Sequence, residues 1–107
     1  MSGKWYQKEV VYIDPDFEDL IPSFLESRRN EIGIIRECIV VSNLAEAQRL
    51  GHGMKGAGAG YGFPEISAIG AKIEEAAKSR DTAGMEEALD MLDEYLSVVE
   101  IRPGESD

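Results

Sequence analysis

The chain has 107 residues, and its 21 acidic and 11 Lys and Arg residues give it a formal net charge of −10. This length supports one domain, and 43% apolar with 30% charged residues is typical of a folded globule rather than a disordered segment. The acidity disfavours nonspecific nucleic-acid binding, which needs clustered Lys and Arg, and the single cysteine, Cys38, excludes an internal disulfide. The single histidine, His52, leaves few kinds of chemistry open.

Residues 1–13 differ from the rest of the chain, because they mix aromatic and β-branched residues without helical periodicity. We expect them to form a short N-terminal extension, either an extended leader or a small additional element. They lack the apolar core of a signal peptide, and no apolar run in the sequence approaches the roughly 20 residues that a membrane-spanning helix needs. We therefore expect a cytoplasmic protein without a membrane partner.

Helical periodicity begins at Asp14 and Pro15, where the residue before proline suits an N-cap and proline suits the first turn. Pro22 removes a backbone hydrogen bond, so we expect it to kink this helix or split it in two. The apolar residues recur at intervals of three and four positions over about six turns and are Phe17, Leu20, Ile21, Phe24, Leu25, Ile32, Ile35 and Ile39.

Three further amphipathic helices follow. Asn43 with Glu46 has the spacing of an N-terminal cap, and the apolar face behind it contains Leu44, Ala47, Leu50 or Gly51, Met54, Gly58 and Tyr61. The next helix begins near Pro64, and its apolar face contains Ile66, Ile69, Ile73, Ala76 and Ala77. The last, capped by Asp81 or Thr82, keeps its acidic residues in solvent and presents inward Met85, Ala88, Leu89, Leu92, Leu96 and Val99.

Four amphipathic helices with short connections predict an all-α fold, an antiparallel up-down-up-down four-helix bundle over residues 14–101. Residues 102–107 are expected to form a disordered tail. Cys38 lies near the end of the first helix, and we expect it to be buried or half-buried and to carry no chemistry.

The segment 51–62 contains six glycines, although each glycine inside a helix costs roughly 1 kcal/mol relative to alanine. A phosphate-binding loop is disfavoured, because the preceding residues are helical and Lys55 is followed by glycine instead of a hydroxyl residue. We expect Gly51, Gly53 and Gly58 to allow close helix packing, and Gly62 to end the helix with a positive φ or a close backbone approach.

On a helix, His52 points away from the apolar face, and its neighbours on the outer face are Gln48, Lys55, Gly56 and Ala59. Lys55 would place an ammonium group beside the imidazole, and the missing side chain of Gly56 would let another protein approach the ring. These features suit a nucleophile that accepts a phosphoryl group. A solvated histidine without function is the common alternative on a helix surface, but this context favours a functional residue.

The string His52-x-Met54-Lys55-Gly56-Ala57, followed by Gly62, closely resembles the signature of histidine-containing phosphotransfer (HPt) domains. The resemblance covers about residues 14–99 and implies a four-helix bundle that shuttles phosphoryl groups between receiver-domain aspartates and has no kinase activity of its own. It implies that His52 accepts the phosphoryl group through Nε2, that Lys55 neutralises its charge and that Gly56 provides clearance.

On the following predicted helix, Glu74 and Lys78 lie where HPt domains often place a group that orients the histidine and a second cation. The two residues are four positions apart and share a face. A solvated charged face is the alternative interpretation. Ala57 departs from the family, which frequently has a hydroxyl residue at this position.

The resemblance implies a response-regulator receiver domain as the partner and, through it, a sensor histidine kinase in a multistep His–Asp phosphorelay of bacterial two-component signalling. It implies no cofactor and no metal site on this chain, because Mg²⁺ belongs to the receiver, and we expect a monomer. Two alternatives stay open. One is an adaptor with the same bundle that binds a receiver or kinase without accepting phosphate. The other is an enzyme that uses His52 as a general base, for which the sequence offers no paired nucleophile or metal constellation.

Overall fold

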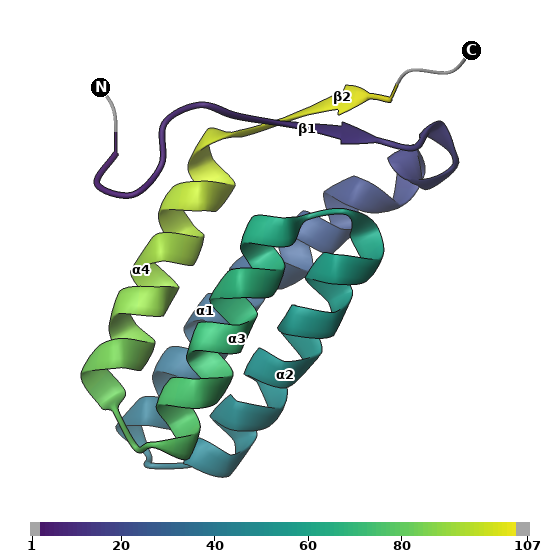
Figure 1. The fold of residues 1–107 in the computed structure, drawn as a ribbon. Coiled ribbons are helices and arrows are strands. Elements are labelled where there is room, and N and C mark those ends of the chain that lie inside the picture. The colour runs from purple at the N-terminus through teal and green to yellow at the C-terminus, as the bar shows by residue number, and fades with distance from the viewer. Residues whose placement is uncertain (1–2, 105–107) are drawn as a thin grey trace.

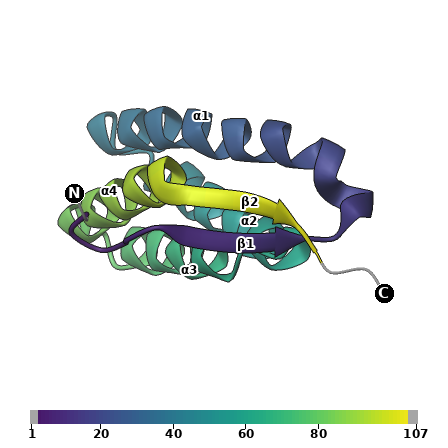
Figure 2. The same cartoon turned by 90° about the horizontal axis from the view of Figure 1, so that it is seen from above.

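The structure, a computed structural model, describes residues 3–104. Its four α-helices form a bundle, and two strands lie side by side across one end of that bundle (Figures 1 and 2). In chain order the elements are β1 (Glu9–Ile13), the 3₁₀ helix η1 (Pro15–Leu20), α1 (Ile21–Val40), α2 (Leu44–Tyr61), α3 (Pro64–Lys78), α4 (Thr82–Val98) and β2 (Val99–Pro103). None of the helices within the described range is both long and apolar enough to cross a membrane.

Capping residues set the helix boundaries. Asn43 accepts a hydrogen bond from the N–H of Glu46 at the start of α2, and Asp81 accepts one from Gly84 at the start of α4. Gly62 ends α2 with a φ of 87°, a left-handed conformation that residues with a side chain rarely adopt. The sequence predictions for these three residues are confirmed.

The first predicted helix is split in two, as Pro22 indicated. Asp14 caps η1 by accepting a hydrogen bond from the N–H of Asp16, and Pro22 lies in the first turn of α1, where its missing N–H removes no intrahelical bond. The predicted apolar face was wrong for Phe17 and Leu20, which are 43% and 48% exposed. A 3₁₀ helix has three residues per turn, so it does not keep the phase of the α-helix that follows.

The core lies between the helices and matches most of the predicted inward positions. Phe24 of α1 stacks on Tyr61 and Phe63, with ring centroids 4.5 and 5.2 Å apart. Cys38 is buried, as expected. The buried residues of α2, α3 and α4 that were predicted to point inward are Leu44, Ala47, Gly51, Met54, Gly58, Ile66, Ile69, Ile73, Ala77, Met85, Ala88, Leu89, Leu92 and Leu96.

Two glycines of α2 let this helix pack closely against α3. A Cβ atom on Gly58 would lie 2.5 Å from the backbone nitrogen of Ser67, and one on Gly51 would lie 2.7 Å from the backbone nitrogen of Glu74. Real Cβ contacts are not this short, so the helices can approach this closely only without side chains at these positions. The prediction of close packing is confirmed for Gly51 and Gly58. It was wrong for Gly53, where a Cβ would enter open space.

The fold is not purely α-helical, because β1 and β2 form a parallel two-stranded sheet whose register pairs Glu9 with Val99 and Ile13 with Pro103. The predicted last helix included Val99, but α4 ends before it and Val99 begins β2. Residues 102–103, expected in a disordered tail, also belong to β2. The expected extension 1–13 contains β1, whose β-branched and aromatic residues suit a strand. Residues 1–2 and 105–107 lie outside the described range.

Glu94 ties the N-terminal segment to α4. Its carboxylate accepts hydrogen bonds from the backbone N–H groups of Lys4 and Trp5, at 2.7 Å each, and from that of Tyr6. Burial alone would raise the pKa of Glu94, but these three hydrogen bonds outweigh it and lower the pKa. Tyr6 also packs edge-on against Tyr95, with ring centroids 5.3 Å apart. These contacts hold the segment that leads into β1 against the end of the bundle.

Candidate functional site

His52 lies in the middle of α2 on its solvent side. Its side chain is 71% exposed, whereas Met54, on the opposite side of the helix, and the preceding Gly51 are buried. The prediction that His52 points away from the core is confirmed. The ring is therefore accessible to another molecule while its backbone is held by a packed helix.

A carboxylate from α3 contacts the ring. The Oε2 atom of Glu74 is 3.0 Å from Nδ1 of His52, and its Oε1 atom is 3.8 Å from Nζ of Lys55. A carboxylate can only accept a hydrogen bond, so this contact favours the neutral tautomer that carries its proton on Nδ1. In that tautomer Nε2 keeps its lone pair and is the nucleophilic atom of the ring.

The missing side chain of Gly51 explains how Glu74 reaches the ring. The backbone of α3 at Glu74 passes directly beside Gly51, the residue that precedes His52. The Glu74 side chain is only 14% exposed, so its surroundings limit the positions that the carboxylate can take. A carboxylate held in this way can fix the orientation of the imidazole with little further loss of side-chain entropy.

Positive charges keep Glu74 ionised. Burial alone would raise the pKa of this carboxyl, but the hydrogen bond and charge of His52, together with the ammonium groups of Lys55 and Lys78, lower it. Lys78 is exposed one helical turn after Glu74, and within residues 3–104 no ion pair joins the two side chains. The carboxylate thus remains an acceptor for Nδ1–H at neutral pH.

Part of the outer face of α2 beside His52 and Lys55 carries no side chain larger than a methyl group. A Cβ atom on Gly53, Gly56 or Gly60 would meet no atom within 4 Å, and Ala59 is exposed among them. We call these four residues the open face. A second protein can approach the imidazole closely over this surface, because nothing larger than a methyl group projects from it.

A surface hollow lies beside the ring and is lined by Ala45, Gln48, Arg49, His52 and Glu74. Gln48 is half-buried there, which places this predicted residue next to the histidine. Arg49 was not assigned to the site from the sequence, although its position three residues before His52 puts it on the same side of the helix. Its Nε donates to Oε1 of Glu46 at 2.8 Å, so the guanidinium is held at the wall of the hollow.

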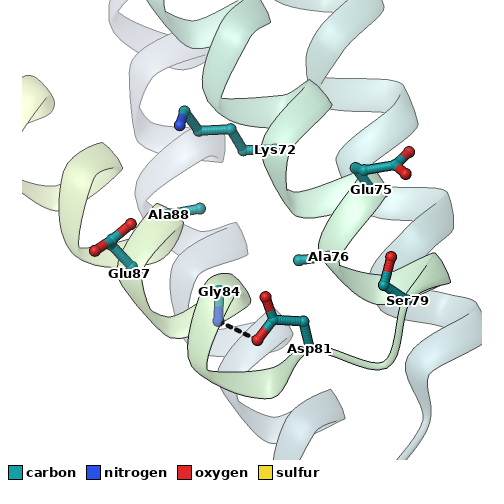
Figure 3. Close-up of a pocket in the computed structure, with 8 residues that line it drawn as sticks. All are labelled: Lys72, Glu75, Ala76, Ser79, Asp81, Gly84, Glu87 and Ala88. Atoms are coloured by element: carbon teal, nitrogen blue, oxygen red, sulfur yellow. Dashed lines mark hydrogen bonds between the residues drawn. The ribbon is translucent and has the colours of Figure 1, made fainter.

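A second hollow lies between α3 and α4 (Figure 3) and is lined by Lys72, Glu75, Ala76, Ser79, Asp81, Gly84, Glu87 and Ala88. The Asp81 carboxylate already accepts the helix-capping hydrogen bond of Gly84. Glu75 and Glu87 lie on opposite sides of the hollow in Figure 3. Its lining contains neither histidine nor cysteine, so it offers no nucleophile comparable with His52.

The predicted site residues therefore fall into three groups. Around the ring, His52 contacts Glu74, which also attracts Lys55, and Gln48 lies in the adjoining hollow. Gly56 and Ala59 belong to the open face, and Lys78 lies further along α3. Among residues 3–104, no three His, Cys, Asp or Glu side chains gather in an arrangement that could hold a metal ion.

Comparison with protein-family models gives one finding: the model described as "Hpt domain" matches residues 19–101. The matched range is most of the chain and includes all four α-helices and His52. The searches of curated proteins and of solved structures returned no match.

Proposed function

Because the chain belongs to the Hpt domain family, we propose that it accepts a phosphoryl group on His52 from the aspartate of a receiver domain and passes it on. Hpt domains are phosphotransfer domains of His–Asp phosphorelays, and they carry phosphoryl groups instead of acting as kinases. The observation that supports the assignment to His52 is its geometry. The ring is exposed beside the open face, and Glu74 contacts Nδ1, which leaves Nε2 available.

In the proposed transfer, the lone pair of His52 Nε2 attacks the phosphorus of the receiver's aspartyl phosphate, in line with the departing carboxylate oxygen. The P–O bond to the aspartate breaks as the P–N bond forms, so the aspartate leaves as a carboxylate. The ring then carries a proton on Nδ1 and the phosphoryl group on Nε2. Glu74 accepts the hydrogen bond from Nδ1 and offsets the positive charge that the ring gains. The reverse sequence returns the group to an aspartate.

Residues around His52 would assist this step by offsetting the phosphoryl charge and by leaving room for the receiver. Lys55 is exposed, and its ammonium group can turn from Glu74 toward the phosphoryl oxygens and offset their charge. Gly56 leaves room for the receiver directly over the ring. Gln48 and Ala59 would lie under the docked partner, and Lys78 would add positive charge at its margin.

We propose a response-regulator receiver domain as the direct partner, a sensor histidine kinase upstream of it and a cytoplasmic location. The transfer needs no cofactor on this chain, because Mg²⁺ is expected only on the receiver. One bundle is sufficient for the chemistry. An antiparallel up-down-up-down order, favoured by connections of two or three residues between the helices, would keep α2 and α3 adjacent.

Phosphotransfer from labelled receivers tests this function. A set of receiver domains charged with labelled phosphate is mixed with the protein, and the label is expected on His52 in an acid-labile form. His52→Gln, checked for folding by circular dichroism, is expected to stay unlabelled. Label on His52→Gln would overturn the assignment. Receiver binding in calorimetry without any transfer to the wild-type protein would favour an adaptor instead.

A further inference from the structure

The sheet at the end of the bundle has a free edge along β1. The carbonyl of Ile13 accepts a hydrogen bond from the N–H of Gly104 at 2.7 Å, so the backbone groups of Ile13 face β2. Backbone groups alternate in direction along a strand, so those of Val10 and Tyr12 point away from β2. No other segment among residues 3–104 pairs with this edge.

The two outer edges of the sheet differ. By the same alternation, Pro103 lies on the outer edge of β2, where its missing N–H interrupts the row of donors. β1 contains no proline, and its outward side chains Val10 and Tyr12 are 37% and 62% exposed. An edge strand with free donors and apolar side chains is a template for pairing with another strand. The β1 edge is therefore the open one.

The charges on either side of β1 indicate which strand fits it. The basic residues Lys4 and Lys8 precede the strand, and the acidic residues Asp14 and Asp16 follow it. When two such strands pair antiparallel, the basic end of each lies beside the acidic end of the other. A second copy of β1 thus carries the complementary charge pattern.

We propose that two copies of this protein associate through antiparallel β1 strands and form a four-stranded sheet of order β2-β1-β1-β2. In the register centred on Val11, Val10 of one copy faces Tyr12 of the other, and their free backbone groups bond to each other. The same register places Lys8 opposite Asp14 twice. The interface is related by a two-fold axis at Val11, so it closes as a dimer.

The dimer is compatible with the rest of the structure. Lys8 contacts Glu100 of its own chain at 2.9 Å, and its ammonium group has further donors for a second carboxylate. The sheet crosses the end of the bundle (Figure 1), whereas His52 lies in the middle of α2, so both histidines stay accessible. This proposal replaces the monomer expected from the sequence, and it does not depend on the proposed phosphotransfer.

Sedimentation equilibrium of the whole chain tests the association. The average molar mass is expected to rise from that of a monomer toward that of a dimer as the protein concentration increases to about 1 mM. Tyr12→Pro removes a donor at the free edge and no β1–β2 bond, so it should weaken the dimer by about tenfold or more. Tyr12→Val keeps the backbone donor and serves as the matched control. Circular dichroism verifies that each variant is folded.

A charge exchange tests the register. Lys8→Glu alone places Glu opposite Asp14, and Asp14→Lys alone places Lys opposite Lys8, so each variant should dimerise about tenfold more weakly. When the two variants are mixed, both facing pairs are opposite in charge, and a 1:1 heterodimer of near wild-type affinity is expected. A structural defect in either variant would not be repaired by mixing.

Three outcomes would overturn the proposal. The first is a wild-type chain that stays monomeric at every concentration. The second is a dimer that neither Tyr12→Pro nor the charge reversals weaken, since its interface would lie elsewhere. The third is a β1 edge that binds only a receiver domain. In that case the protein would not self-associate, and Tyr12→Pro would weaken its binding to the receiver. Phosphotransfer to His52 in the dissociated variants is read separately from mass, so the failure of one proposal is distinguishable from that of the other.

Discussion

The two faces of α2 use glycine for opposite purposes. On the inner face, Gly51 and Gly58 let the backbone of α3 come within 2.5–2.7 Å of where a Cβ would lie. On the outer face, Gly53, Gly56 and Gly60 have no atom within 4 Å of that point. The inner glycines set the spacing between helices, and the outer ones keep the surface around the histidine clear. A glycine-rich run can therefore remain a regular helix and provide close approach on both sides.

Gly58→Ala should disrupt the packing of α2 against α3 and have the largest effect on stability. The new methyl group would lie 2.5 Å from the backbone nitrogen of Ser67, which cannot move without shifting α3. We expect the free energy of unfolding to fall by about 2 kcal/mol, because overpacking outweighs the gain in helix propensity. Urea unfolding measures this change. A variant as stable as the wild type would show that the helices separate easily.

Gly56→Leu should separate function from stability on the outer face. The added side chain would project beside His52 into open space, so the fold should remain stable while phosphotransfer from a receiver falls by about tenfold or more. Single-turnover labelling gives the rate. Gly33→Leu is the matched control, because Gly33 is equally unobstructed but lies on α1. Equal rates for both variants would contradict the clearance role of Gly56.

Gly53→Ala should stabilise the protein, whereas Gly58→Ala should destabilise it. A methyl group at Gly53 meets nothing, so the gain in helix propensity should raise the free energy of unfolding by about 0.5–1 kcal/mol. Thermal or urea unfolding detects a change of this size. A loss of stability in Gly53→Ala would contradict the assignment of Gly53 to the open face.

Glu74→Gln should have the smallest effect on stability, because the His52 end of its contact is exposed. The pKa of Glu74 is lowered in the folded chain, so its carboxylate stabilises the fold above the ordinary Glu pKa of about 4.3, and this contribution is lost as pH falls through the lowered pKa. Urea unfolding of both proteins between neutral pH and pH about 3 should show a stability difference that shrinks with acidity. A constant difference would contradict the role of the charge.

Local signals made much of the bundle predictable. The caps at Asn43 and Asp81, the helix end at Gly62 and the outward direction of His52 each depend on a few neighbouring residues. The exposure of Gly53 could also have been predicted, because Gly53 lies about 200° around the helix from the buried Gly51. The approach of Glu74 to the ring could be expected only from the family resemblance, because periodicity does not specify which residues of two helices meet.

Two features could not be predicted from the sequence: the pairing of β1 with β2 and the 3₁₀ geometry of η1. The residues of β1 suit a strand, but their partner strand follows about 90 residues later, and nothing near either segment indicates the pairing. The exposure of Phe17 and Leu20 depends on the 3₁₀ geometry of η1, which apolar spacing does not distinguish from an α-helix. These differences arise where the chain departs from the four helices.

The parallel pairing of β1 with β2 has a consequence for the order of folding. Joining Glu9 to Val99 closes a loop of about 90 residues, and closure of such a loop costs about 4 kcal/mol of chain entropy beyond a constant. The helix contacts are much more local, and once formed they bring the two segments together at little further cost. We therefore expect the sheet to form last, so that hydrogen exchange at the β1 amides that face β2 reports when the whole chain has finished folding.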